Sequence, residues 1–159
     1  MIIVTALRKF MEHKPYNKLA ISLIISLGIM YAVMFLNVYD ADHVYLSVTR
    51  LYMAILMVAP MAVLMLLMMG HMFMNKRLNM LIHGLSVAVF LITLILLRTQ
   101  TPVNDKQYMR AMIPHHSSAI LTSKRANIDD PEVLELSKKI IKSQEREIKQ
   151  MKDLLERMK

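Results

Sequence analysis

The sequence predicts an all-α protein in which three transmembrane helices are followed by an extramembrane antiparallel helical hairpin. Hydrophobic residues make up 55% of the 159 residues, and the chain has only 3 glycines. The apolar residues gather in long runs in the first two thirds, whereas the last third is polar with apolar residues at helical spacing. Long apolar runs are typical of membrane helices, and spaced apolar residues are typical of helices that pack on one face.

Three runs are candidates for membrane helices: Leu19 to Tyr39, Leu51 to Phe73 and Leu78 to Leu97. Each is roughly 20 residues long and nearly free of charge, so as a helix it spans the roughly 30 Å of hydrocarbon in a bilayer. Basic residues precede the first run, as in a signal peptide, but the run is too long and no small-residue cleavage site follows. We therefore expect the first run to remain as an anchor.

Lysine and arginine in short flanking segments indicate the orientation, because they favour the cytoplasmic side. They cluster in residues 8–18, before the first run, and at Lys76 and Arg77, between the second and third runs. This pattern places the N-terminus in the cytoplasm and the chain from Arg98 onward in the periplasm or outside the cell. We expect an integral protein of a bacterial inner or plasma membrane, with membrane lipid as a partner.

The expected organisation has a cytoplasmic basic N-terminus at 1–18, a membrane region at 19–103 and a helical hairpin at 104–159. The first hairpin helix runs from about Asp105 to Ala126. The second has a clear start, because Asp130 suits the N-cap position and the next residue is a proline. A hairpin of this size has a small core, so we expect a homo-oligomer that completes a four-helix bundle, with each chain supplying half.

The charge and cysteine content exclude several classes. The net charge of +8 does not indicate a nucleic-acid partner, because the basic residues are divided between membrane flanks and a helix that also carries glutamates. The absence of cysteine excludes disulfide frameworks and thiolate metal sites. Methionine and histidine remain as ligands for soft metal ions in an oxidising compartment.

The most informative motif is a cluster of methionines and histidines in the first hairpin helix. Met109, Met112, His115 and His116 lie within about two helical turns. Thioether sulfur and imidazole nitrogen together are ligands that copper favours. The sequence therefore predicts a copper site, with Cu(I) favoured over Cu(II) and with silver as a further ion for the same ligands.

The second hairpin helix faces this cluster when the two helices are folded antiparallel. This brings Met112 level with Gln144 and Glu145, and Met151 lies one or two turns further along the same face. Gln144 either sets the register of the bundle or hydrogen-bonds a ligating imidazole. Glu147 is a second candidate for that supporting contact.

Several motifs of the tail resemble the DUF305 family. The resemblance covers about residues 104 to 159 and rests on Asp105, Tyr108, Met109, Met112 to His116, Ala119, Ile120, Asp130 to Glu132 and Gln144 to Met151. It implies a ferritin-like helical fold and, through CopM-type periplasmic members, copper binding by methionine and histidine. The ligand candidates it implies are Met109, Met112, His115, His116 and Met151. Many members carry further methionines after the His pair, where this chain has Ser117, Ser118 and Thr122.

Two features of the first hairpin helix have a second interpretation. His115 and His116 point about 100° apart on a helix, so both cannot face the same metal ion equally well. One of them can form a hydrogen bond or cap instead of binding the metal ion. Pro114 removes the backbone bond to Arg110 and costs about 3 kcal/mol inside a helix. It indicates either a helix restart or a kink that redirects the two imidazoles.

The second apolar run carries methionines at steps of mostly three and four, from Met53 to Met72. The spacing of Met57, Met61 and Met65 is similar to the Met-x-x-x-Met pair of three-span copper importers of the Ctr type, so copper permeation is one interpretation. Methionine also forms helices well and packs adaptably, so packing or lipid contact is the other. Asp40, Asp42 and His43 suit either a divalent ion or, as we expect, a short polar turn.

We expect a membrane-anchored copper-binding protein that acts in copper buffering, handover or resistance at the outer face. A ferritin-like di-iron site needs Glu-x-x-His pairs, which the sequence lacks, and no nucleophile with a base is evident, so we do not expect an enzyme. Two alternatives remain. One is a structural or regulatory membrane protein whose methionines only pack, and the other is permeation along the methionine stripe.

Overall fold

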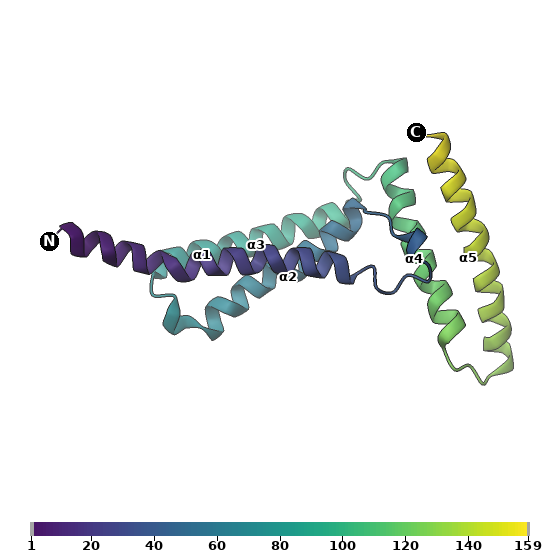
Figure 1. The fold of residues 1–159 in the computed structure, drawn as a ribbon, viewed down its shortest axis with the longest axis horizontal. Helices are drawn as coiled ribbons and strands as arrows, with labels where there is room; N and C mark the ends of the chain where they lie inside the picture. The colour runs from purple at the N-terminus through teal and green to yellow at the C-terminus, as the bar shows by residue number, and fades with distance from the viewer. Residues whose placement is uncertain (1, 159) are drawn as a thin grey trace. The chain divides into compact units, whose positions relative to one another are not determined.

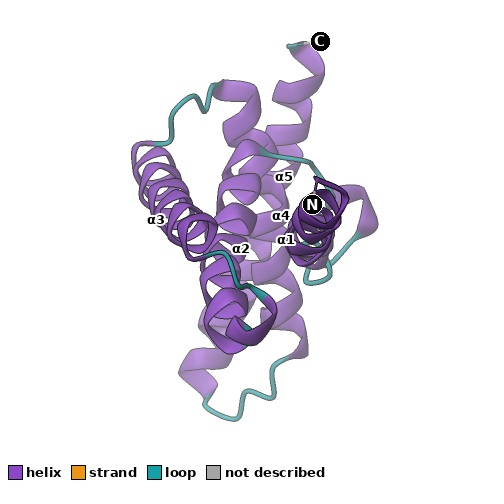
Figure 2. Cartoon of the chain, turned by 90° about the vertical axis from the view of Figure 1, so that its left-hand side faces the viewer, coloured by secondary structure: helices purple, strands orange, loops and turns teal. Residues whose placement is uncertain are grey.

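The computed structural model describes the backbone of residues 2–158 and the side chains of residues 15–158. Within this range the chain is helical and has no strand (Figure 2). The long helices are α1 (Ile2–Val33), α2 (Val48–Met68), α3 (Lys76–Thr99), α4 (Asp105–Arg125) and α5 (Pro131–Arg157). The predicted all-α fold is confirmed.

The chain divides into two compact units. The apolar unit holds α1 up to Tyr31 together with Tyr52–Thr99, and the polar unit holds Ala32–Leu51 together with the chain from Gln100 onward. The α1–α2 loop, residues 34–47, therefore groups with α4 and α5. From the sequence we placed this loop in the membrane region, and we did not predict that the loop packs with α4 and α5.

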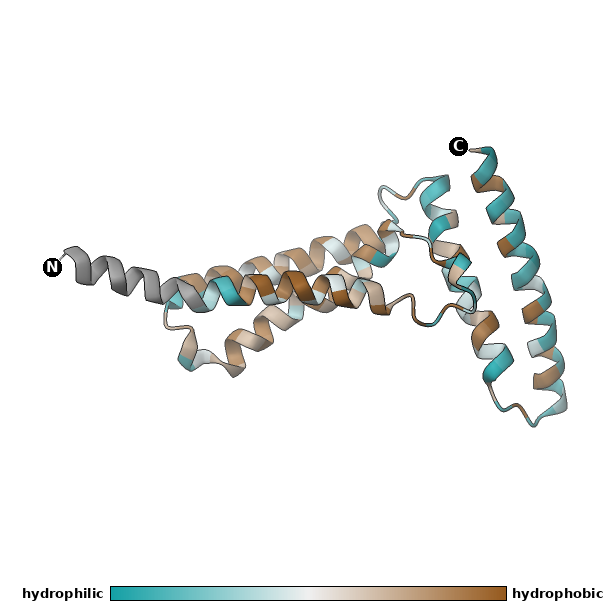
Figure 3. Ribbon diagram, viewed as in Figure 1, coloured by the Kyte–Doolittle hydropathy of each residue, from teal (hydrophilic) through white to brown (hydrophobic). Residues whose placement is uncertain are grey.

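Three helices are long and apolar enough to cross a membrane, over Pro15–Val33, Val48–Met68 and Lys76–Thr99. Figure 3 shows brown, apolar residues along them. Two predicted ends were wrong, because α1 ends at Val33 and α2 at Met68 rather than at Tyr39 and Phe73. Apolar residues continue beyond both helices into turns, and hydropathy does not distinguish an apolar turn from a helix.

One end of the apolar unit is held by a buried cluster and a small polar network. Tyr16, Leu19, Leu66 and Phe73 form the cluster. The Tyr16 hydroxyl donates to Asn79 Oδ1 at 2.7 Å, and Asn79 Nδ2 donates to the Phe73 carbonyl at 2.7 Å. These bonds satisfy polar groups that would be costly to bury alone, and they join α1 to α3.

In the polar unit, α4 and α5 lie side by side and run antiparallel (Figure 1). Ser137 Oγ on α5 donates to the Ser123 carbonyl on α4 at 3.2 Å, and farther along the pair His116 lies against Glu147. Residue numbers rise on one helix as they fall on the other. Figure 3 shows brown and teal residues alternating along α5, as expected for a helix that packs on one face.

Both helices begin with a side-chain cap. Asn104 Oδ1 accepts the Gln107 N–H at 3.0 Å, and Asp130 Oδ1 accepts the N–H groups of Glu132 and Val133 at 2.9 and 3.0 Å. Each cap satisfies amides that a helix leaves without an internal partner. The predicted cap of the second helix, with Pro131 in its first turn, is confirmed.

The core of the polar unit lies between α4 and α5. Met109, Ile113 and Ile120 of α4 meet Ile148 and Met151 of α5 in one buried cluster. The helix α4 continues from Asp105 to Arg125 through the buried Pro114, so it does not restart there.

Candidate metal centre

His116 is the ligand candidate with the most defined surroundings. Its side chain is 13% exposed, and its Nδ1 lies 3.3 Å from Oε2 of Glu147 on α5. The two atoms do not meet in hydrogen-bond geometry, so Nδ1 is buried beside the carboxylate without a hydrogen bond. Ser143 Oγ donates to the other carboxylate oxygen at 2.7 Å and holds Glu147 in place. A carboxylate beside one ring nitrogen leaves the other, Nε2, for a metal ion.

The surroundings of His116 favour the neutral imidazole. Burial is the largest influence and lowers its pKa below the ordinary value. The charge of Glu147 raises the pKa, and the neighbouring His115 lowers it further. Only neutral imidazole has a lone pair for a metal ion, so His116 is in the form that can bind one at neutral pH.

Thioether sulfur lies on the same faces of the two helices. Met109 and Met151 are 5% and 9% exposed in the buried cluster, and Met112 packs against it. Met112 and His116 are four residues apart on α4, and Glu147 and Met151 are four apart on α5, so each pair shares a face. Because the helices are antiparallel and His116 lies opposite Glu147, Met112 falls opposite Met151.

The expected register of the two helices was wrong by nearly two helical turns. Folding about the centre of the connecting turn placed Met112 level with Gln144, whereas the structure places His116 against Glu147. Packing of Ile148 and Met151 into the cluster sets the register instead of the turn. Gln144 is half-buried one turn nearer the connection, and Glu147 is the residue of α5 that lies against His116.

His115 occupies a different environment from His116. It is exposed, and its ring centroid lies 6.0 Å from that of His116 with the planes tilted by 58°. Among the described side chains, no three His, Asp or Glu residues lie close enough together to hold a metal ion. A site on this helix pair therefore depends on thioethers as well as imidazole.

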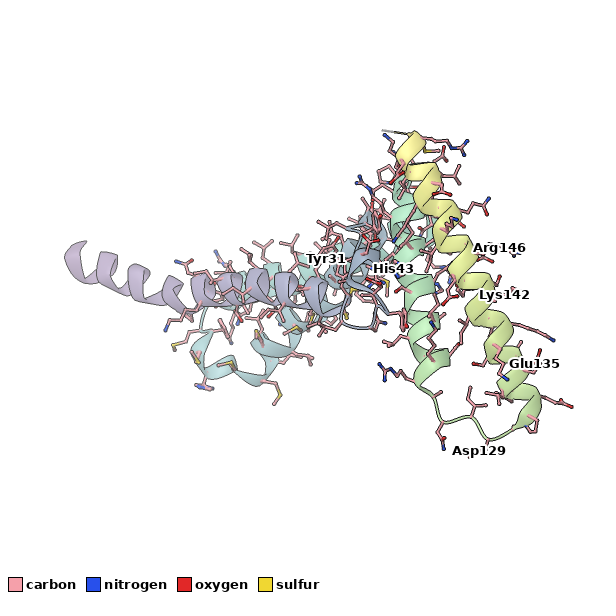
Figure 4. All side chains as sticks on the ribbon, turned by 45° about the vertical axis from the view of Figure 1, so that its right-hand side comes forward. Tyr31, His43, Asp129, Glu135, Lys142 and Arg146 are labelled. Atoms are coloured by element: carbon pink, nitrogen blue, oxygen red, sulfur yellow. The ribbon has the colours of Figure 1, made fainter. Side chains whose placement is uncertain are left out.

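The α1–α2 loop contacts α4 immediately after the His pair, and Figure 4 shows His43 beside this helix. Ser117 is fully buried, accepts the Tyr39 N–H at 2.8 Å and lies 2.9 Å from Nδ1 of His43. Ser118 Oγ accepts Asn37 Nδ2 at 2.9 Å. Ser117 and Ser118 stand where many members of the family that the tail resembles carry methionine, and in this chain both bind the loop.

The same loop also reaches α5, and the first residue of α2, directly after the loop, reaches the first turn of α4. Asp42 forms an ion pair with Lys152, which lowers the pKa of Asp42. The Val48 N–H donates to Gln107 Oε1 at 3.0 Å. Tyr45 packs against the buried cluster between the helices. From the sequence we expected a short polar turn at Asp40, Asp42 and His43 and did not predict these contacts. The serines after the His pair were the only feature of the sequence that could have indicated them.

His43 is buried enough to shift its titration. Burial is the largest influence and lowers its pKa, and the charge of Lys152 lowers it as well. Asp40 and Asp42 act in the opposite direction. Like His116, it is therefore held in the neutral form near pH 7.

The methionine stripe of α2 does not line the groove between α1, α2 and α3. Met53 and Met57 are 43% and 42% exposed, and Met61 and Met65 are half-buried. A groove of about 310 Å³ lies between α1, α2 and α3. The residues of α2 that line it are Ile55, Val58, Ala59 and Ala62. The stripe therefore faces elsewhere.

Comparison with known proteins identifies a family and one relative. The family described as "Domain of unknown function (DUF305)" matches residues 68–155, more than half of the chain. The match runs from the end of α2 through α3 and α4 into α5, so the expectation that the whole three-span region lies outside the resemblance was wrong for α3. "Uncharacterized protein L153" of Acanthamoeba polyphaga mimivirus is 38% identical over 117 residues, which cover 72% of this chain and 74% of that protein. No solved structure matches the chain.

Proposed function

The chain belongs to the DUF305 family, and from this premise we propose that its α4–α5 helix pair binds a soft metal ion, copper above all, at the outer face of a membrane. The ion is Cu(I) rather than Cu(II), and silver suits the same ligands. Binding serves copper buffering, handover or resistance and not catalysis. One observation carries the proposal: His116 on α4 lies against Glu147 on α5. The four-residue spacing on each helix then sets Met112 opposite Met151.

The ligands are two thioethers and one imidazole nitrogen. Met112 and Met151 supply sulfur from the two helices, and His116 supplies Nε2. Glu147 lies beside Nδ1, where its carboxylate stabilises the positive charge that the ring gains on binding a metal ion, as carboxylates behind ligating histidines do. Met109, deeper in the cluster, and the exposed His115 are the remaining ligand candidates.

The outer location rests on the membrane helices and the basic residues around them. Three helices are long and apolar enough to span, and an odd number of spans separates the N-terminus from the helix pair. Lysine and arginine in residues 8–18 and at Lys76 and Arg77 favour the cytoplasm for the N-terminus and for the α2–α3 connection. The helix pair then lies in the periplasm or outside the cell.

A homo-oligomer accounts for apolar side chains that the single chain leaves exposed. Val133, Leu134 and Leu136 of α5 are 49%, 40% and 56% exposed after α4 has packed. A two-helix unit has little core of its own, and a second copy gains stability by covering such side chains. Two helix pairs then form the four-helix, ferritin-like bundle.

A second candidate function is structural. Met109 and Met151 are buried in one cluster with isoleucines, which is the environment of methionines that only pack. In that case the protein is a structural or regulatory membrane protein whose helix pair binds itself, and it has no affinity for soft metals.

A competition titration with the full chain in lipid nanodiscs separates the two candidates. Cu(I) and Ag(I) are titrated against a chromophoric chelator for the wild type, His116→Ala and His71→Ala, the last being an exposed histidine outside the helix pair. We expect the wild type and His71→Ala to bind equally and His116→Ala to bind about tenfold or more weakly. Equal and negligible binding by all three favours the structural candidate.

A further inference from the structure

We propose that the α1–α2 loop is part of the metal centre, such that docking of the loop on the helix pair and binding of the metal ion stabilise each other. The inference rests on the proposed metal site and extends it to a segment far away in the sequence. The loop contacts residues directly adjacent to the ligands on both helices.

The contact on α4 is next to His116. Ser117 has no exposed surface, and its hydroxyl meets the Tyr39 N–H and Nδ1 of His43 at 2.8 and 2.9 Å. A buried hydroxyl that loses such partners is costly, so this turn of α4 has its stable arrangement only with the loop docked. Ser117 is thus a positioning residue for His116.

The contact on α5 is next to Met151. Lys152 forms an ion pair with Asp42 of the loop, and the two side chains are 24% and 78% exposed. An exposed ion pair adds little stability, but it fixes where the loop lies on α5. Between the two contacts, Tyr45 packs on the cluster that contains Met109 and Met151.

The coupling follows from a shared requirement. The metal ion takes ligands from α4 and α5, so it needs the register that places Met112 opposite Met151. The loop binds Ser117 on α4 and Lys152 on α5, so it needs the same register. Two binding events that need one arrangement favour each other, and the effect is equal in both directions.

The test combines a variant with a measurement on the loop itself. Ser117→Ala removes the hydroxyl that binds the loop, and the matched control Thr122→Ala removes an exposed hydroxyl of α4 that donates only to the Ser118 carbonyl of its own helix. In nanodiscs we expect Ser117→Ala to weaken Ag(I) binding about fivefold or more, and Thr122→Ala by less than about twofold. Saturating Ag(I) is expected to slow amide hydrogen exchange of Tyr39 in the loop and of Val48 directly after it in the wild type.

A second variant keeps the test decisive if Ser117→Ala does not fold. Asp42→Asn breaks an exposed ion pair and is expected to weaken Ag(I) binding in the same direction by a smaller factor, with Asp129→Asn in the α4–α5 connection as its control. If the wild type binds Ag(I) but these variants bind it equally well and loop exchange does not change, the inference is overturned and the metal site stands. No Ag(I) binding by the wild type overturns both.

Discussion

Glu147→Gln is the sharpest perturbation of the proposed centre. It removes a negative charge that lies 3.3 Å from Nδ1 of His116 and keeps the size of the side chain. When Nε2 donates to a metal ion, the ring becomes more positive, and the carboxylate stabilises it. Removing the carboxylate partner of a ligating histidine weakens metal binding by about 10- to 100-fold.

The exposure of Glu147 sets the expected size of the effect. Its side chain is 38% exposed, so water screens part of its charge. Glutamine can still accept a hydrogen bond through its carbonyl oxygen. We therefore expect the lower end of the range, a loss of about tenfold in Cu(I) affinity, which equals about 1.4 kcal/mol.

The assay is a Cu(I) competition titration of the full chain, with Glu145→Gln as the matched control. Glu145 lies two residues away on α5, and its carboxylate binds Lys124 at 2.9 Å instead of His116. We expect the control to change affinity by less than about twofold, and Ser143→Ala to have an intermediate effect because it only holds Glu147. Glu147→Gln binding as tightly as the wild type would refute the idea that this carboxylate supports the metal ligand.

Four further predictions follow from the same structure. Met151→Leu conserves volume, so the free energy of unfolding, measured by thermal denaturation, should change by less than about 1.5 kcal/mol while Ag(I) affinity falls. If the variant unfolds as well as losing Ag(I) affinity, Met151 is a packing residue. Ile113→Ala empties a fully buried site and should cost about 2–5 kcal/mol in urea unfolding followed by circular dichroism. His43 and His116 have pKa values lowered from 6.5, so as pH falls from 7 to 5 the unfolded state takes up protons first, and stability present above about pH 6.5 is lost. A lower protection factor for the amides of the α1–α2 loop at pH 5 than at pH 7, after correction for the intrinsic exchange rate at each pH, checks this, and an unchanged protection factor contradicts it. Because the stripe does not line the groove between the helices, leucine at its central methionines should leave copper flux into proteoliposomes unchanged, and a fall in flux would restore permeation. The methionines replaced are Met57, Met61 and Met65.

Local features of the chain could be predicted from the sequence because their causes are local. The start of α5 follows from Asp130 and Pro131, whose side chains act on the amides next to them. The three long apolar helices follow in the same way from residues that are adjacent in the chain. Divergence of the two histidine rings follows from the 100° step of a helix.

Contacts between distant segments could not be predicted in the same way. The register of α4 and α5 depends on how Ile148 and Met151 fit against α4, which the length of the connection does not determine. The binding of Tyr39 and His43 to Ser117 joins residues that are 78 and 74 positions apart in the chain, and no periodicity of the sequence indicates it. Gln144 and Glu147 were both predicted as polar partners of a ligating imidazole, and only the register of the two helices decides that Glu147 lies against His116.

X-ray absorption of the copper-loaded full chain tests the central claim most directly. With Cu(I) bound, we predict mixed sulfur and nitrogen scatterers in the wild type, loss of the nitrogen shell in His116→Ala, and a reduced sulfur shell in Met151→Leu. A spectrum with only oxygen and nitrogen scatterers, or one that neither variant changes, would contradict a copper site built from Met112, His116 and Met151.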